Sequence, residues 1–169
     1  IPSLTTSQIA SIPHSGYVAS WSSGARAALT AAQVQSLNLS SFEIRYLTST
    51  QMGWLSAAQI QQVRFYEFQL LQPGQIPLLS AAQITSILHG GYVASWSAAA
   101  RQALTASQVQ LFNMAVFRAV NFTPEQIGWM TAAQVREFRF YELNLLQPAQ
   151  IPMLDPAQMA SIPHSGYVA

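Results

Sequence analysis

The chain consists of a long sequence unit that repeats at a fixed period. Residues 11–85 align without a gap on residues 86–160, and 42 of the 75 positions are identical. A fixed period of this kind is typical of proteins in which each unit buries its apolar face against the next unit. We therefore divide the chain into the end of one repeat (1–10), two whole repeats (11–85 and 86–160) and the start of another (161–169), as part of a longer array.

Composition excludes several classes of partner. Only 8% of the residues are charged, against roughly 25% in a typical soluble domain. The formal net charge of +1 creates no long-range field that would attract nucleic acid or anionic lipid. The chain has no Cys, hence no disulfide and no thiolate metal site. No apolar run approaches the roughly 20 residues of a membrane span, so we expect no nucleic-acid partner and no membrane-spanning segment.

A shorter motif marks helix starts. It consists of an apolar residue, then Ser, Thr or Asp, two variable residues, Gln, and a second apolar residue, as in Leu29-Thr30-Ala31-Ala32-Gln33-Val34. A side-chain oxygen at the N-cap accepts from the N3 backbone N–H, while Gln at N3 reaches back to the N-cap N–H, which completes a capping box. The apolar residues then lie at N′ and N4 and form a hydrophobic staple. The predicted N-caps are Thr5, Thr30, Thr48, Ser56, Ser80, Thr105, Thr123, Thr131 and Asp155.

Other residues support or extend these helix starts. Pro124 and Pro156 fall at N1, the helical position where a missing N–H has no cost. Ser22 and Ser97 fit the N-caps of additional helices. Ser40 opens one more capping box in the first unit, whose cap is lost in the second unit.

The sequence predicts mostly short helices. The two longest are expected at residues 56–71 and 131–146, because Pro73 and Pro148 follow their ends. Isolated helices need roughly 12 to 15 residues to be stable in water, so shorter ones must be held by stacking. We therefore predict an all-α fold in which about six or seven short helices per 75-residue unit are wound into a superhelical array, an α-solenoid-like rod.

One His recurs in each unit and is the first candidate for a metal or pH-sensing site. No second His, Cys or carboxylate lies nearby in the sequence, so the ligand spacing is poor and we interpret these residues as turn or packing residues. A metal or pH-sensing site between units is the alternative. Ser15 and Ser165 each follow a His, but Gly90 replaces them in the middle unit and no acid accompanies them, which argues against a serine nucleophile. The three His residues are His14, His89 and His164.

Aromatic residues recur at fixed positions in the unit. We interpret them as packing contacts between layers, with outward-facing surfaces for sugar stacking or self-association as the alternative. They are Tyr17, Trp21, Trp54, Phe65, Tyr66 and Phe68 in the first unit, and Tyr92, Trp96, Trp129, Phe140 and Tyr141 in the second.

The charged residues form no repeated acid–base pair. Arg64 and Glu67, like Arg139 and Glu142, are spaced i and i+3 on the predicted long helices, where an exposed ion pair contributes about 0.2–0.5 kcal/mol. We therefore expect no enzyme activity and no catalytic, cofactor-binding or metal-binding residue. The six acids are Glu43, Glu67, Glu125, Glu137, Glu142 and Asp155.

The LTxxQ[VI]xxL segments, such as the one that begins at Leu29, resemble those of giant bacterial cell-surface or secreted proteins, which carry long arrays of segments like LTTAQVAAL. The resemblance covers nearly the whole chain and implies an extracellular, structural or adhesive role. A fainter resemblance links the segments to the repeats of TAL effectors, which open with LTxxQVxxI and continue with a GxQAL-like stretch, compared here with residues 24–29 and 100–104. TAL repeats are shorter and have a basic surface, and this chain shares neither property.

Two functions follow as hypotheses. The first is a structural repeat segment of a long bacterial cell-surface or extracellular filament, whose partner is itself through stacking of repeat units. The alternative is an α-solenoid binding module or adhesin that recognises a protein or glycan. A binding face is expected to carry the positions whose chemistry changes between units, namely Glu43/Arg118, Arg45/Val120, Tyr46/Asn121 and Ser36/Leu111.

Overall fold

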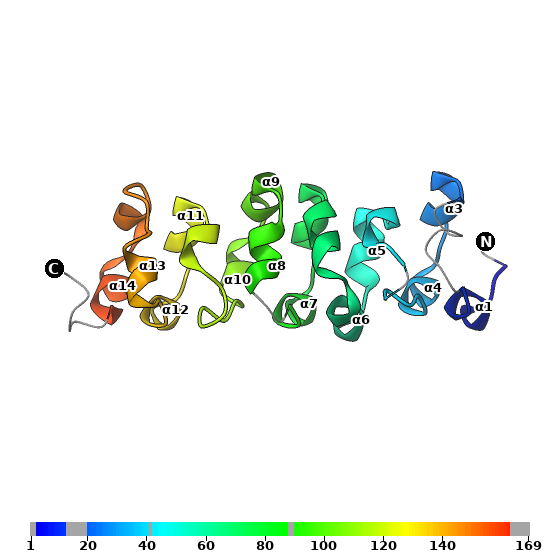
Figure 1. Ribbon diagram of the computed structural model, residues 1–169, viewed down its shortest axis with the longest axis horizontal. Coiled ribbons are helices and arrows are strands. Elements are labelled where there is room, and N and C mark those ends of the chain that lie inside the picture. Colours follow the sequence, from blue (N-terminus) through cyan, green and yellow to red (C-terminus); the bar gives the residue numbers. More distant parts are fainter. Residues whose placement is uncertain (1–2, 13–19, 41, 88–89, 163–169) are drawn as a thin grey trace.

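The protein is all-helical in the part that the structure, a computed structural model, describes: residues 3–12, 20–40, 42–87 and 90–162. These residues form short α-helices and 3-10 helices and no strand. The helices follow one another along a single long axis, with the two ends of the chain at opposite ends of the molecule (Figure 1). The predicted all-α fold class is confirmed.

The helices form three rows along this axis, which are defined by packing and by hydrogen bonds between neighbours. Row A lies along one edge in Figure 1, row B along the opposite edge, and row C between them. Row A contains α1 (Thr6–Ala10), α4 (Ala31–Gln35), α6 (Ala57–Gln62), α7 (Ala81–Thr85), α10 (Ala106–Val109), α12 (Ala132–Arg136) and α14 (Pro156–Ser161). Row B contains α3 (Ser23–Ala27), α5 (Ser49–Trp54), η3 (Pro73–Leu78), α9 (Ala98–Gln102), α11 (Pro124–Gly128) and η5 (Ile151–Met153). Row C contains η1 (Ile44–Tyr46), η2 (Phe65–Leu70), α8 (Gly90–Ser95), η4 (Ala119–Asn121) and α13 (Phe140–Leu143).

Helices of one row recur at a nearly constant interval along the sequence. In row A the successive N-caps Thr5, Thr30, Ser56 and Ser80 are each separated by about a third of the repeat unit. Helices of one row pack on each other, as α6 does on α7 and η1 on η2. We call three consecutive helices, one from each row, a layer. The described part of the second unit, from α8 to α14, therefore comprises three layers.

The nine capping boxes predicted from the repeated motif are all present. In α4, Thr30 Oγ1 accepts from the Gln33 N–H at 3.3 Å, and Gln33 Oε1 accepts from the Thr30 N–H at 2.9 Å. Ser22 and Ser97 also cap their helices, and both Pro residues of the motif stand at the starts of their helices. These caps satisfy N–H groups that a helix cannot satisfy internally.

Removal of a cap should destabilise the fold. We expect Thr30→Ala or Thr105→Ala to lower the free energy of unfolding by about 0.5–2 kcal/mol each, because the N3 N–H loses its partner. Thr→Ser at the same positions should be nearly silent, since the hydroxyl is kept. Thermal or urea unfolding monitored by circular dichroism measures both effects. An unchanged Ala variant would refute the contribution of the cap.

The two predicted long helices are wrong. Residues 56–71 form α6 and η2, separated at Val63, which is extended with φ −63° and ψ 126°. The second copy likewise divides into α12 and α13. The physical reason is that a new helix start follows each break: in the second copy, the Glu142 carboxylate accepts from the Arg139 N–H at 3.1 Å, as an N3 Gln does elsewhere.

The capping box predicted at Ser40 is also wrong. Its N–H and hydroxyl both donate to Asn38 Oδ1, at 3.0 and 2.6 Å, which makes a local turn instead of a helix start. The next helix, η1, begins only at Ile44. The described part of residues 11–85 contains eight helices, more than the six or seven expected, because the long helix is divided and residues 73–78 form η3.

The staple residues build the core. Residues at N′, such as Leu55 and Leu79, and at N4, such as Ile60, Ile76 and Ile84, are at most 5% exposed. Most helix starts of the motif contribute one residue of each kind, so a single apolar core runs through the successive layers, whereas Met159 at the last described start is exposed. A helix too short to persist alone is therefore held by burial against both neighbouring layers.

Two glycines at the same position of the unit let neighbouring helices of row B approach closely. A Cβ on Gly128 would lie 3.0 Å from the Met153 carbonyl oxygen, and one on Gly53 would lie 3.2 Å from that of Leu78. Gly24 in α3 has nothing within 4 Å. The lack of a Cβ thus allows close backbone approach at Gly53 and Gly128 but has no such role at Gly24.

Substitution by alanine should affect stability differently at Gly24 and at Gly128. Gly24→Ala should raise the free energy of unfolding by about 0.4–1 kcal/mol, because it restricts the unfolded chain and favours the helix. Gly128→Ala should give no such gain, because the backbone at Met153 must move. Chemical denaturation of the two variants in parallel tests this, and equal stabilisation by both would contradict the close approach.

Candidate functional site

The predicted His and Ser candidates lie outside the described residues. This applies to His14, His89, His164, Ser15 and Ser165, while Gly90 is described only as the start of α8. Within the described residues, no group of three or more His, Cys, Asp or Glu side chains is placed to hold a metal ion. The interpretation of these His residues as turn or packing residues, and the alternative of a metal or pH-sensing site, therefore stay predictions.

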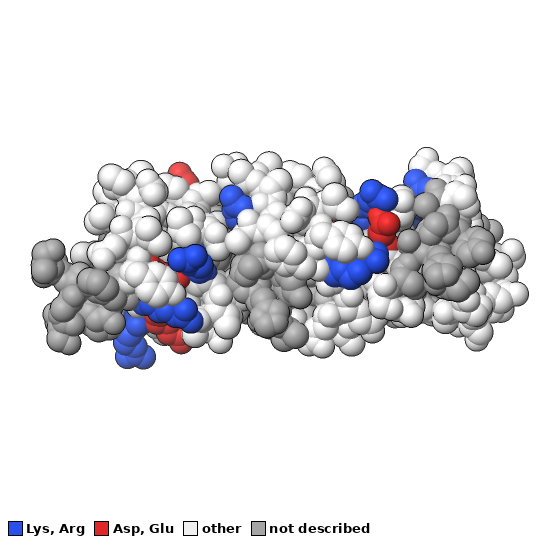
Figure 2. All heavy atoms as spheres, viewed as in Figure 1, with Lys and Arg blue, Asp and Glu red and all other residues white. Residues whose placement is uncertain are grey.

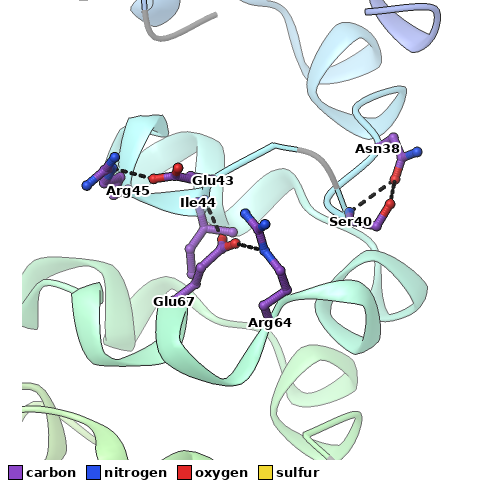
Figure 3. A network of polar contacts seen from close by, with 7 residues as sticks. All are labelled: Asn38, Ser40, Glu43, Ile44, Arg45, Arg64 and Glu67. Carbon is purple, nitrogen blue, oxygen red and sulfur yellow. Dashed lines mark hydrogen bonds and ion pairs between the residues drawn. The ribbon is translucent and has the colours of Figure 1, made fainter. Parts of the chain in front are cut away.

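The acids with the clearest contacts have structural roles. Asp155 caps α14, where its Oδ1 accepts from the Gln158 N–H at 2.7 Å. Glu67 is fully buried: Oε2 accepts from the Ile44 N–H at 3.0 Å, and Oε1 accepts from Arg64 Nε at 2.6 Å (Figure 3). The ion pair between Arg64 and Glu67 is therefore buried at its carboxylate, and the energy of an exposed pair does not apply to it. The hydrogen bond to this carboxylate raises the pKa of Arg64.

The second unit uses the corresponding residues differently. Glu142 is also buried, but the Arg139 guanidinium donates to the Tyr141 hydroxyl at 2.7 Å and to the Ala115 carbonyl at 2.6 Å. The hydrogen bond to Tyr141 raises the pKa of Arg139. The nearest cationic group to the Glu142 carboxylate among the described ion pairs is Arg118, at 4.0 Å.

The aromatic residues divide into buried and exposed members. Trp96 and Phe68 are 2% exposed and belong to the core. Phe65, Tyr66 and Tyr141 are 43–49% exposed, and Trp129 is also exposed. Trp21 and Trp54 are half-buried and pack against the core, so the interpretation as packing contacts is correct for them and for the buried members. Tyr17 lies outside the described residues, and so do the side chains of Tyr92 and Phe140.

The glutamines at N3 connect successive layers. Gln59 Nε2 donates to the carbonyls of Val34 and Leu37, both at 3.0 Å, in the preceding layer. Its Oε1 meanwhile accepts from the Ser56 N–H of its own helix. One side chain therefore satisfies the N-terminus of one helix and the C-terminal carbonyls of another.

This contact recurs throughout the described chain. It joins residues 22 to 32 positions apart in the sequence, and the side chains that make it are at most 7% exposed. The ten glutamines are Gln33, Gln51, Gln59, Gln75, Gln83, Gln108, Gln126, Gln134, Gln150 and Gln158. We call this set the glutamine ladder.

Sequence reasoning assigned these glutamines to capping alone and missed two of them. Gln75 and Gln150 follow Gln72 and Gln147, which lack the Ser, Thr or Asp of the motif. The apolar residues at N′ and N4, Leu71 and Ile76 in the first unit, carried the signal. No local sequence pattern indicated which carbonyls the glutamine Nε2 groups bind, because those carbonyls lie in another layer.

Arginine and tyrosine side chains gather in row C and beside it. The Tyr46 ring lies against Arg26 and Arg45, with guanidinium carbons 5.1 and 4.9 Å from its centroid. Arg64 lies 4.9 Å from the Tyr66 centroid, and Arg118 lies 5.6 Å from that of Tyr141. In Figure 2 most of the charged side chains visible on this face gather in one group toward each end of the molecule.

Three of the four pairs of positions that change chemistry between units lie together in this region. Glu43, Arg45 and Tyr46 border or belong to η1, and Arg118, Val120 and Asn121 occupy the same places at η4. Arg45 pairs with Glu43 at 2.5 Å (Figure 3), whereas Val120 is 43% exposed. Ser36 and Leu111 follow α4 and α10 and are half-buried.

Two neighbouring pockets open beside these positions in the second unit. One, of about 110 Å³, is lined by Val120 and Asn121, and the other, of about 340 Å³, by Glu125 and Trp129. Gln102 lines both. The arrangement offers an exposed aromatic ring beside amide and carboxylate groups, and the residues that line it include no nucleophile–base pair.

The described residues contain no helix long and apolar enough to span a membrane. Comparisons of the chain with protein-family models, with curated proteins and with solved structures found no match.

Proposed function

We propose that this chain is a structural repeat segment of a long bacterial cell-surface or extracellular filament. Its repeat units stack as a superhelical, α-solenoid-like rod, and its main partner is more of the same repeat. The proposal includes no enzyme activity. The cellular location rests on the resemblance of the LTxxQ[VI]xxL segments to those of giant surface and secreted proteins.

The glutamine ladder is the observation that carries this proposal. Each layer binds the preceding one through a buried side-chain amide, as Gln59 and Gln134 do at equivalent positions of the two units. In row A the contact has no inherent end, because every described helix of this row carries a Gln at N3. Such nearest-neighbour contacts suit indefinite extension along one axis.

The parent protein provides the test. Sequencing of the gene that encodes this segment should reveal further copies of the repeat unit and a secretion signal, and mass spectrometry should find these units in the mature chain. Electron microscopy of the native assembly should show rods whose axial repeat matches the spacing of the layers. A mature chain with no further unit, or one confined to the cytoplasm, would contradict the proposal.

The alternative function is recognition of a protein or glycan. The observation in its favour is that Val120 and Asn121, which differ from Arg45 and Tyr46 of the first unit, line a pocket beside exposed Trp129. A glycan array should then show binding that Trp129→Ala abolishes. Trp54→Ala at the equivalent place in the first unit should leave it intact. If no glycan on the array binds, glycan recognition is contradicted and the structural function remains.

A further inference from the structure

The two pockets beside η4 differ in size and in lining. The smaller one, of about 110 Å³, has apolar side chains from Ala98, Val120 and Phe122 beside the amide of Asn121. Small-molecule sites occupy roughly 300–1,000 Å³, so this pocket suits a substituent of a ligand. The neighbouring pocket, of about 340 Å³, lies within that range and is lined by Trp129. The pair therefore suits a ring that carries one small side group.

The amide of Asn121 has a donor that the described protein does not satisfy. Its Nδ2 is buried and has no hydrogen-bond partner among the described residues. A buried N–H group without an acceptor costs free energy. Because the χ2 torsion of Asn is broad, rotation of the amide can present this donor to an acceptor in the pocket that Asn121 lines. The smaller pocket thus favours a group with an acceptor oxygen beside a small apolar part, and an acetyl group has both.

The larger pocket combines a stacking surface with polar groups. Trp129 is 36% exposed, and the side chains of Gln102 and Glu125 beside it are exposed as well. Neither of these two polar side chains makes a hydrogen bond or an ion pair within the described part of the chain. An aromatic ring packs against the apolar face of a pyranose, while amides and carboxylates bind its hydroxyl groups. This lining favours a sugar ring.

The first unit keeps the tryptophan, as half-buried Trp54, but not the polar groups around it. The Tyr46 ring there lies 5.1 Å from the guanidinium carbon of Arg26. Arg26 is the counterpart of Arg101, which lines the smaller pocket in the second unit. We therefore expect the site in the second unit alone. The replacements in the first unit are Tyr46 for Asn121, Ala27 for Gln102 and Thr50 for Glu125.

We propose that the second unit binds an N-acetylated pyranose sugar. The acetamido group enters the smaller pocket, where its carbonyl oxygen accepts from Asn121 Nδ2 and its methyl group packs against Val120. The sugar ring stacks on Trp129, and its hydroxyl groups bind Gln102 and Glu125. The inference rests on the recognition function given above as the alternative and names the class of its ligand.

Matched sugars test the acetamido contact. N-acetylglucosamine and N-acetylgalactosamine differ from glucose and galactose only by an acetamido group in place of a hydroxyl. In NMR titrations of the full chain, followed at the indole N–H of Trp129, at least one acetylated sugar should bind about tenfold or more tightly than its counterpart. Equal affinities would overturn the inference and leave glycan recognition in place. Absence of any shift with both acetylated sugars would also overturn it, and the glycan array separately decides whether recognition as a whole fails.

Variants at Asn121 test the donor. Asn121→Asp keeps the shape of the side chain but removes its N–H groups, so it should weaken binding of the acetylated sugar by about tenfold or more. Asn113→Asp is the matched control and should bind like wild type, since Asn113 is exposed and uses only its Oδ1, which accepts from the Ala115 N–H at 2.9 Å.

Asn121→Tyr introduces the residue of the first unit and places no charge near the core, so it tests the same donor in a chain that keeps its fold. It should also lose the preference for the acetylated sugar, with a circular dichroism spectrum like that of wild type. Wild-type affinity in a folded variant at Asn121, or an equal loss in Asn113→Asp, would overturn the proposal.

Discussion

Gln59→Glu should lower the free energy of unfolding by about 3–5 kcal/mol at neutral pH, the size of effect seen when a buried charge is left without its partner. The Glu side chain keeps the acceptor for the Ser56 N–H but loses both Nε2 donor hydrogens. A carboxylate would then face the Val34 and Leu37 carbonyls, each 3.0 Å from the present donor. Urea unfolding measures the loss. Gln61→Glu, at an exposed position of the same helix, should change stability by about 0.5 kcal/mol or less.

The destabilisation should depend on pH. Burial raises the folded-state pKa of the new carboxyl group above its unfolded value of about 4.3. The penalty is therefore absent below the unfolded pKa, grows as pH rises toward the folded pKa, and is constant above it. The variant should regain stability relative to wild type on acidification. A difference between variant and wild type that does not change with pH would mean that the carboxylate escapes to solvent.

Ile76→Ala should lower the free energy of unfolding by about 2–5 kcal/mol, because the removed atoms leave a cavity under the next layer. Ile151→Ala is a matched control at the same position of the second unit, where the side chain is 49% exposed and not covered. It should cost about 0.5 kcal/mol or less in the monomer. Denaturation at low protein concentration compares the two without self-association.

The comparison tests the direction of the stack as well as its stability. Equal large losses at the two positions would mean that the end layer is covered in solution, and equal small losses would mean that Ile76 is not under the next layer.

The sequence by itself determined the local structure of the helix starts. Thr30 and Gln33 bond within one turn of each other, so the motif contains both partners and needs no other part of the chain. The staple residues could likewise be assigned to the core, because N′ and N4 lie on one side of a capped helix. For the same reason, the all-α fold class and the need for stacking followed from the pattern.

The break at Val63 and the new helix start after Leu71 were missed although a signal was present. Apolar residues recur every eight positions at Leu47, Leu55, Val63, Leu71 and Leu79, and a helix begins after each. Arg64 and Gln72 occupy the N-cap position, where the motif has Ser, Thr or Asp. These two helix starts therefore lack the hydroxyl or carboxylate oxygen that marks the others in the sequence. Local propensity therefore favoured one long helix over residues 56–71, while burial of Val63 between α6 and η2 favoured two short ones.

Only the tertiary structure decided what the other end of each glutamine binds. The Nε2 of Gln83 donates to the carbonyls of Met52 and Leu55, which precede it by 31 and 28 positions and which no local pattern relates to it. The same holds for Glu67. The backbone group that it meets in the adjacent layer is the Ile44 N–H, which is a donor, whereas the glutamines meet carbonyl acceptors. The choice between Gln and Glu at N3 follows the polarity of the backbone in the adjacent layer, and that backbone comes into contact only when the layers stack.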